Sequence, residues 1–135
     1  MKKAYVSVSY DLREELRAEL SAIEGTLAES GFQAYIFVDK YTYSPGQDRE
    51  MMQAACEEIQ HSDILVAELS DKAIGIGIEI GYASALNIPI LYLRRQGTEY
   101  SKTAGGLANT QFVYHGPEDL KEKLRISISE LFPSH

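Results

Sequence analysis

The sequence predicts an α/β protein with one five-stranded parallel β-sheet and helices on both of its faces. Short β-rich runs alternate along the chain with longer segments of helical periodicity, which is the pattern of strands joined by helical connections. Right-handed connections of this kind produce a parallel sheet that is buried on both sides. The composition, 44% hydrophobic and 24% charged among 135 residues, is typical of a globular protein, so we expect one domain over residues 1–135.

The first predicted strand and helix are well marked. Lys3–Ser9 alternates as a strand does, and Asp11 is the expected N-cap of the following helix, with Glu14 as its capping-box partner. Gly31 is the expected end of this helix. The residues spaced for its buried face are Leu16, Leu20, Ile23 and Leu27.

A second strand and helix follow. Gln33–Val38 is β-rich, and Ser44-Pro45 predicts a helix start with proline at the first helical position. The expected inner face of this helix carries Met52, Ala55 and Ile59.

The second half of the chain contains the other three expected strands, which are Asp63–Leu69, Ile88–Leu93 and Gln111–His115. The segment Gly75–Leu86 between the first two is glycine-rich at its start and then helical. Gly116-Pro117 opens a last helix whose inward residues are Leu120, Leu124, Ile128 and Leu131. Residues 94–110 show no clear periodicity and predict a long loop that is functional or mobile.

Charge and cysteine content narrow the possible partners. The formal charge of −7 disfavours binding of a nucleic-acid polymer. A single cysteine, Cys56, excludes an internal disulfide and suits a reducing compartment, so we expect a cytoplasmic protein. No apolar run is long enough to cross a bilayer, and the basic start at Lys2 and Lys3 leads into a strand, so we expect neither membrane association nor a signal peptide.

Several common chemical motifs are missing. His61, His115, His135 and Cys56 lie far apart in the sequence, so no metal-ligand spacing exists, and the chain has no P-loop and no Gly-x-Ser-x-Gly elbow. The glycines at positions 75, 77 and 81 differ in spacing from the dinucleotide fingerprint. We therefore expect no metal and no cofactor.

The segment Asp63–Ala83 is the most informative about chemistry. Gly75 and Gly77 allow a tight passage into a helix and close approach of a ligand to the backbone. Glu79 is expected in the first turn of that helix, pointing toward the crevice while Ile76, Ile80 and Ala83 face the core. A carboxylate there gains from the helix dipole and should be ionised, as a nucleophile must be. The alternative interpretation is that Glu79 only complements the dipole.

The string from Ser62 to Ala83, SDILVAELSDKAIGIGIEIGYA, resembles the nucleoside 2-deoxyribosyltransferase superfamily, which includes the 2′-deoxynucleoside 5′-phosphate N-hydrolases. The resemblance implies a flavodoxin-like (Rossmann-like) fold and a nucleophilic glutamate, here Glu79, that attacks the anomeric carbon. It also implies that Tyr5 hydrogen-bonds this carboxylate and that Ser9 binds a 5′-phosphate. Ser101 matches a serine that enters the neighbouring subunit's pocket, which implies a homodimer with shared sites.

Two departures from the family pattern concern the leaving base and the phosphate. Ala55 stands where the family has an aspartate that handles the base, so Asp48 and Glu58, on the same helical stripe, become candidates for that role. Asp11 lies just beyond Ser9, where a phosphate site favours a basic residue.

Three hypotheses follow for the function. The leading one is an N-glycosidase that acts on a nucleoside or nucleoside 5′-monophosphate, by hydrolysis or base exchange. The second is a non-catalytic nucleotide-binding or sensing domain, which the Ala55 departure favours. A phospho-receiver domain ranks last, because Asp11 and Asp71 are present but no lysine follows the last strand before Lys121.

Overall fold

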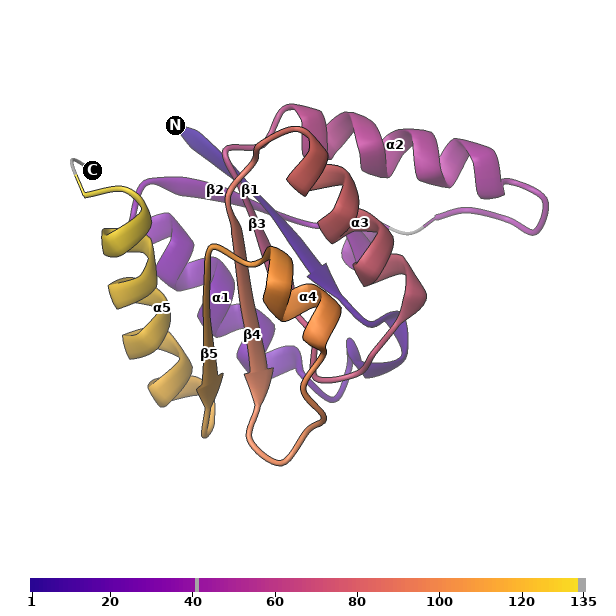
Figure 1. Ribbon diagram of the computed structural model, residues 1–135. Coiled ribbons are helices and arrows are strands. Elements are labelled where there is room, and N and C mark those ends of the chain that lie inside the picture. The colour runs from indigo at the N-terminus through magenta and orange to yellow at the C-terminus, as the bar shows by residue number, and fades with distance from the viewer. Residues whose placement is uncertain (41, 134–135) are drawn as a thin grey trace.

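The computed structural model describes residues 1–40 and 42–133 and contains the expected five-stranded parallel sheet (Figure 1). Its strand order is β2-β1-β3-β4-β5, so β1, β3 and β4 lie inside the sheet. The predicted fold class is confirmed, and each predicted strand is present within two residues of its expected ends. The strands are β1 (Lys2–Val8), β2 (Phe32–Ile36), β3 (Ile64–Glu68), β4 (Ile90–Arg95) and β5 (Thr110–Tyr114).

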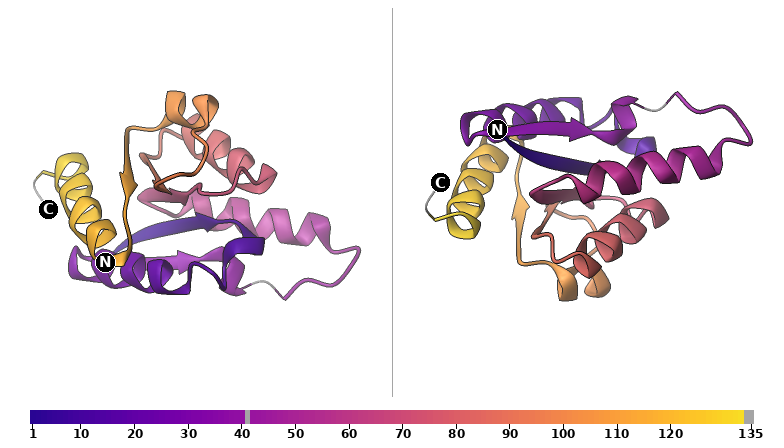
Figure 2. Two further views of the ribbon diagram at one scale, coloured as in Figure 1. Left: turned by 90° about the horizontal axis from the view of Figure 1, so that it is seen from below. Right: turned by 90° about the horizontal axis from the view of Figure 1, so that it is seen from above.

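The helices cover both faces of the sheet (Figures 1 and 2). Residues of α1 (Arg17–Glu29) and α5 (Pro117–Leu131) share one hydrophobic cluster. Residues of α2 (Asp48–Gln60), α3 (Ile74–Ala85) and the short α4 (Lys102–Leu107) share the other. None of the helices in the described ranges is long and apolar enough to cross a membrane.

The central strands are buried on both sides because each face of the sheet carries its own cluster. In β1, Val6 and Val8 face the α1/α5 cluster, whereas Tyr5 faces the α2/α3 cluster. This alternation is the two-residue period of a strand. It places Tyr5 and Ser7 on the same side of the sheet as α3, where a side chain of that helix can reach them.

The first helix begins later than predicted. Asp11 lies in a 3-10 turn, Tyr10–Leu12, and α1 begins at Arg17 after Leu16, with no side-chain cap. Leu16 is fully buried and its carbonyl accepts from the Leu20 amide at 2.8 Å, so the helix starts where the chain enters the core. The prediction that Asp11 caps the helix was wrong. Asp11 and Glu14 have the spacing of a capping box, but the burial of Leu16 determines where the helix starts. Gly31 ends the helix as predicted, with φ +87°.

The start of the second helix also differs from the prediction. Pro45 and Gly46 form a tight turn in which the Gln47 amide donates to the Ser44 carbonyl at 3.1 Å, and Gly46 has φ +91°. Proline followed by a glycine of positive φ is the pattern of a type II turn, so Pro45 precedes the helix instead of opening it. The helix and residues 42–47 before it project beyond the sheet (Figure 2).

The buried face of α2 is partly as expected. Ala55 and Ile59 are buried in the α2/α3 cluster. Met51 packs against that cluster, whereas Met52 lies beside a shallow cavity on the other side of the helix, so the assignment of Met52 to the inner face was wrong. Two adjacent methionines differ by about 100° around a helix, and only one of them can face the core.

The segment 94–110 is not one long loop. It contains the helix α4, whose N-cap is Ser101: the Ser101 hydroxyl accepts from the Ala104 amide at 3.2 Å. Six residues are too few to display a helical period, so the sequence pattern could not reveal this helix.

Candidate active site

Glu79 lies on α3, and its side chain reaches back toward the sheet. The helix begins at Ile74, so Glu79 is in its second turn and the first turn contains no acidic residue. The expected first-turn position was therefore wrong, and the helix dipole, which acts mainly within the first turn, contributes little to this carboxylate. Ile76, Ile80 and Ala83 face the core as predicted.

Two hydroxyl groups of β1 hold the Glu79 carboxylate. The Tyr5 hydroxyl donates to Oε2, as the resemblance implied, and the Ser7 hydroxyl donates to Oε1 at 2.8 Å. Tyr5, Ser7 and Glu79 are 0%, 1% and 9% exposed. The sequence pattern alone did not single out Ser7, although its position two residues after Tyr5 on one strand was a signal that could have found it.

Burial and hydrogen bonding act in opposite directions on this carboxylate. Burial raises the pKa of Glu79, and the hydrogen bonds from Tyr5 and Ser7 oppose that rise by stabilising the ionised form. Burial, together with the adjacent Glu79 charge, raises the pKa of Tyr5, so the phenol remains a neutral donor. The site therefore combines a desolvated carboxylate with two fixed neutral donors.

Aromatic contacts fix the ring of Tyr5. Its centroid lies 6.0 Å from the ring of Tyr35 on β2 and 6.0 Å from that of Phe37, in the short 3-10 segment Phe37–Lys40 after β2. Tyr43 stacks in turn on Phe37 at 6.4 Å. This row limits the movement of the Tyr5 hydroxyl, so its hydrogen bond to Glu79 is preorganised.

Ser9 continues the polar row of β1 beyond Ser7. It is nearly fully buried, and its hydroxyl donates to Asp71 Oδ2 at 2.8 Å. Asp71 is exposed in the connection between β3 and α3. The serine that the resemblance associates with a 5′-phosphate therefore faces a carboxylate.

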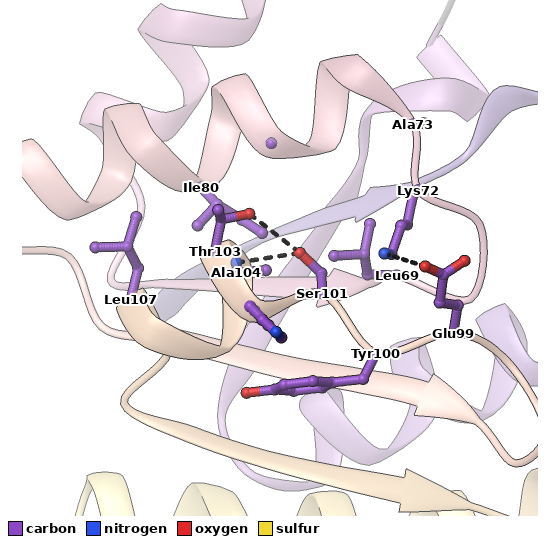
Figure 3. Close-up of a pocket in the computed structure, with 12 residues that line it drawn as sticks. Leu69, Lys72, Ala73, Ile80, Glu99, Tyr100, Ser101, Thr103, Ala104 and Leu107 are labelled. Atoms are coloured by element: carbon purple, nitrogen blue, oxygen red, sulfur yellow. Dashed lines mark hydrogen bonds and ion pairs between the residues drawn. The ribbon is translucent and has the colours of Figure 1, made fainter.

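A cavity of about 500 Å³ lies between α3 and α4 (Figure 3). Its lining includes Gly77 and Ile80 from α3 and Ser101 from the start of α4, but not Glu79. The Ser101 hydroxyl is within 3.2 Å of the Thr103 hydroxyl, and Lys72 pairs with Glu99 at 2.7 Å at the rim. Within one chain, Ser101 therefore lines this cavity and Glu79 does not.

The two glycines of the motif leave open space at the start of α3. A Cβ atom added at Gly75 or at Gly77 would meet no other atom within 4 Å. Their lack of a side chain is therefore not required by packing within the described part of the chain. Approach of a ligand to this backbone stays a prediction.

The two acidic candidates on α2 do not join the carboxylate. Asp48 is exposed at the start of α2, beside the cavity that Met52 borders. Glu58 borders a separate cavity of about 150 Å³. Ala55 is fully buried. In the described residues, the hydrogen-bond partners of Glu79 are Tyr5 and Ser7, not these carboxylates.

A second buried carboxylate, Glu68, lies on the opposite face of the sheet and was also missed. It accepts from the Tyr114 hydroxyl at 2.5 Å, and from the hydroxyl and amide of Ser70 at 2.6 and 2.9 Å. The Ser70 hydroxyl also accepts from the Arg95 amide at 2.8 Å. Burial raises the pKa of Glu68. This network fixes the first residues of the β3–α3 connection.

The described ranges, residues 1–40 and 42–133, contain no group of three or more His, Cys, Asp or Glu residues that could hold a metal ion. The His61 Nδ1 lies 2.8 Å from the Glu57 carbonyl, and the His115 Nδ1 lies 3.3 Å from Asp119. His135 lies outside the described residues.

Comparison with known proteins identifies relatives over most of the chain. The family model for nucleoside 2-deoxyribosyltransferase matches residues 4–124. One curated relative, "Putative 2′-deoxynucleoside 5′-phosphate N-hydrolase 1" from Syntrophotalea carbinolica, is 40% identical over 75 residues. That alignment spans 53% of this chain and 53% of the relative, so it covers about half the length of each.

Two solved structures share the fold at low sequence identity. A CMP N-glycosidase from Clostridium botulinum aligns with a TM-score of 0.70 at 22% identity, covering 93% of this chain and 99% of its own. A 2-deoxyribosyltransferase from Bacillus psychrosaccharolyticus aligns with a TM-score of 0.71 at 17% identity, covering 88% and 90%. At these identities the likeness shows the fold.

Proposed function

The chain belongs to the nucleoside 2-deoxyribosyltransferase family, and from this premise we propose that it is an N-glycosidase acting on a nucleoside or nucleoside 5′-monophosphate. Glu79 attacks the anomeric carbon, and the base leaves with the electron pair of the glycosidic bond. Water then hydrolyses the glycosyl ester, or a second base accepts the sugar. The names of two relatives, a 5′-phosphate N-hydrolase and a CMP N-glycosidase, support this reaction class.

The position of Glu79 is the observation that carries the proposal. In parallel α/β sheets, ligands bind outside the carboxyl ends of the strands. Glu79 lies beside the carboxyl-terminal half of β1, with both carboxylate oxygens held by hydroxyl groups of that strand. A carboxylate fixed in this way is preorganised for attack. Tyr5 is the proposed partner that orients it.

The proposed substrate contacts are Ser9, Ser101 and the backbone at Gly75 and Gly77. The two serines favour a 5′-phosphate, whereas the Asp71 carboxylate bonded to Ser9 disfavours a dianion there. Both nucleosides and their monophosphates are therefore proposed substrates, and the assay must contain matched pairs of them.

Handling of the leaving base distinguishes the enzyme from a second candidate function. Ala55 supplies no proton or hydrogen bond to a departing base, and its burial places a methyl group in the core. Asp48 or Glu58 reaches the base only if the substrate extends along α2. If neither does, the protein is a nucleotide-binding or sensing domain that retains the pocket, and the Ala55 position is the observation that favours this alternative.

We also propose that residues 1–135 act as one domain and that two copies associate. On α3, the apolar side chains of Ile74 and Ile78, one turn apart, are 83% and 52% exposed, and Leu86 at the C-cap of the helix is 42% exposed. An exposed apolar stripe of this kind marks an interaction surface. The adjacent cavity contains Ser101, so a second copy bound there would lie within reach of that serine.

The test is a chromatographic assay for free base, with nucleosides and their 5′-monophosphates, in the presence and absence of an acceptor base. We expect wild-type protein to release base and Glu79→Gln to release none. Glu118→Gln, at an exposed glutamate of α5, is the matched control and should retain full turnover.

The possible outcomes separate the candidate functions. A new nucleoside formed only with an acceptor base would assign base exchange instead of hydrolysis. Nucleotide binding by calorimetry without base release would favour the sensing domain. Full turnover by Glu79→Gln would exclude the glutamate mechanism.

A further inference from the structure

Ser7 is a polar residue at a fully buried position of the sheet. It is 1% exposed, lies between Val6 and Val8 on β1, and pairs in register with Ala67 of β3. A buried hydroxyl requires a hydrogen-bond partner, and the partner of Ser7 is Glu79 Oε1 at 2.8 Å. The polar side chain is thus directed at the carboxylate that we propose as the nucleophile.

The two donors of β1 together fix the plane of this carboxylate. Tyr5 and Ser7 lie on the same face of the strand and reach Oε2 and Oε1 respectively. One hydrogen bond would leave the group free to rotate about its terminal carbon–carbon bond, because that torsion has broad minima. Two bonds from one rigid strand remove the rotation, so the orientation depends on Ser7 as much as on Tyr5.

Both donors are held in place. The Tyr5 ring is stacked against Tyr35 and Phe37, with centroids 6.0 Å away in both cases, so its hydroxyl stays on Oε2. The Ser7 side chain is short and comes from an inner strand of the sheet, so its hydroxyl stays on Oε1. Each carboxylate oxygen has two lone pairs, so Oε1 can attack while Ser7 still donates to it.

We propose that Ser7 is a positioning residue that holds Glu79 Oε1 in the orientation for attack, while Tyr5 holds Oε2. This inference rests on the proposed glycosidase function. In the step concerned, the bond from Oε1 to the anomeric carbon forms and the bond from that carbon to the base nitrogen breaks. The base takes the electron pair, and the Ser7 proton stays on Ser7.

The surroundings of Glu79 explain why this hydroxyl affects ionisation. Burial is the largest influence on the Glu79 pKa and raises it, and the hydrogen bonds from Tyr5 and then Ser7 lower it. Two further titratable groups lie near Tyr5, namely Tyr35 on β2 and Cys56 on α2, and both raise the pKa of Tyr5. Loss of the Ser7 hydroxyl should therefore move ionisation of Glu79 to higher pH.

The first test is the pH dependence of kcat/KM. We expect the acid limb of Ser7→Ala to move upward by about one pH unit, as for loss of a hydrogen bond to a charged group, so the defect shrinks as the pH rises. Ser7→Cys should lie between Ser7→Ala and wild type, because a thiol is a weaker donor. Ser127→Ala, at a buried serine of α5, is the matched control and should follow the wild-type profile.

The second test does not require activity. The ¹³C signal of the Glu79 carboxyl, assigned by its absence in Glu79→Gln, is titrated in wild type, Ser7→Cys and Ser7→Ala. An upward shift of the midpoint in the order Ser, Cys, Ala supports the inference. If the midpoints follow that order but none of the three proteins releases base, the proposed glycosidase function is wrong. The hydrogen bond from Ser7 to the carboxylate would still be supported.

Two results would overturn the inference. One is an identical midpoint in all three proteins. The other is a loss of activity in Ser7→Ala that is equal at every pH, because that pattern would assign Ser7 to packing alone. Circular dichroism confirms that each variant folds, and Ser7→Cys, with nearly the volume of serine, supplies the answer if Ser7→Ala does not fold.

Discussion

At the scale of the residue, the Glu79 carboxylate occupies an environment that disfavours its charge. Burial raises its pKa, and only two neutral hydroxyl groups oppose that rise. A protein under selection for stability alone would place an uncharged side chain here, because buried charge without a counter-ion destabilises the folded state. Retention of a buried ionisable group whose pKa is shifted is typical of functional sites.

This environment predicts that Glu79→Gln stabilises the protein near neutral pH. Because the folded-state pKa of Glu79 is raised, the stability that this group contributes is full below the unfolded-state pKa and is lost as the pH rises through the folded-state pKa. Glutamine does not titrate, so the free energy of unfolding of the variant should fall less over this range. Urea unfolding at a series of pH values from 4 upward measures the difference.

The control for this prediction is Glu118→Gln, where the side chain is exposed on α5. Over the same pH series, the free energy of unfolding of this variant should change by the same amount as that of wild type. If Glu79→Gln is less stable than wild type at pH 7, the prediction is wrong. That result would show that the hydrogen bonds from Tyr5 and Ser7 stabilise the ionised carboxylate by more than its burial costs.

At the scale of the element, a turn that precedes α2 decides where the helix begins. Gly46 adopts φ +91° in the turn closed by the Gln47 amide and the Ser44 carbonyl. Only glycine adopts this conformation without steric cost. The turn directs the chain into α2, which carries Ala55 and Ile59 into the α2/α3 cluster beside the candidate site.

We predict that Gly46→Ala destabilises the protein by about 1–2 kcal/mol, the cost of a left-handed conformation for an L-residue. The matched control is Gly25→Ala in the middle of α1, where an added Cβ meets no atom within 4 Å. That variant should be more stable than wild type by about 0.5–1 kcal/mol, because alanine favours the helix. Chemical denaturation measures both changes, and equal effects of the two substitutions would contradict the turn assignment.

At the scale of the whole molecule, the exposed apolar stripe of α3 is the feature that a single copy leaves unexplained. Ile74 and Ile78 project from the helix that also holds Glu79, and the cavity beside them carries Ser101. Association of two copies through this face would cover the stripe. It would also bring the start of α4 of one copy near the α3 helix of the other.

We predict a mass of about twice 15.1 kDa by light scattering for wild type, and 15.1 kDa for the double variant Ile74→Glu, Ile78→Glu. Base release should fall in that variant, since the shared sites would be lost. Ile126→Glu, at a 50% exposed isoleucine of α5, is the control and should keep the wild-type mass. A wild-type mass of one chain would contradict the proposed dimer.

The sequence by itself determined the fold class and the five strands, and it singled out Glu79 as the candidate nucleophile. Alternating apolar residues and glycine spacing are local patterns, and a strand or a helix face is a local consequence of them. The buried faces of α1 and α5 and the end of α1 at Gly31 followed from the same periodicity. These features needed no knowledge of which segments meet.

Only the tertiary structure decided which groups share the site. Ser7 joins Glu79 across 72 positions of sequence because β1 lies within reach of α3, and Ser9 bonds to Asp71 across 62. The starts of α1 and α2, and the existence of α4, also depended on contacts outside each segment. Parallel sheets bring together residues that are distant in sequence, so the partners of a side chain are fixed by packing and cannot be inferred from local pattern.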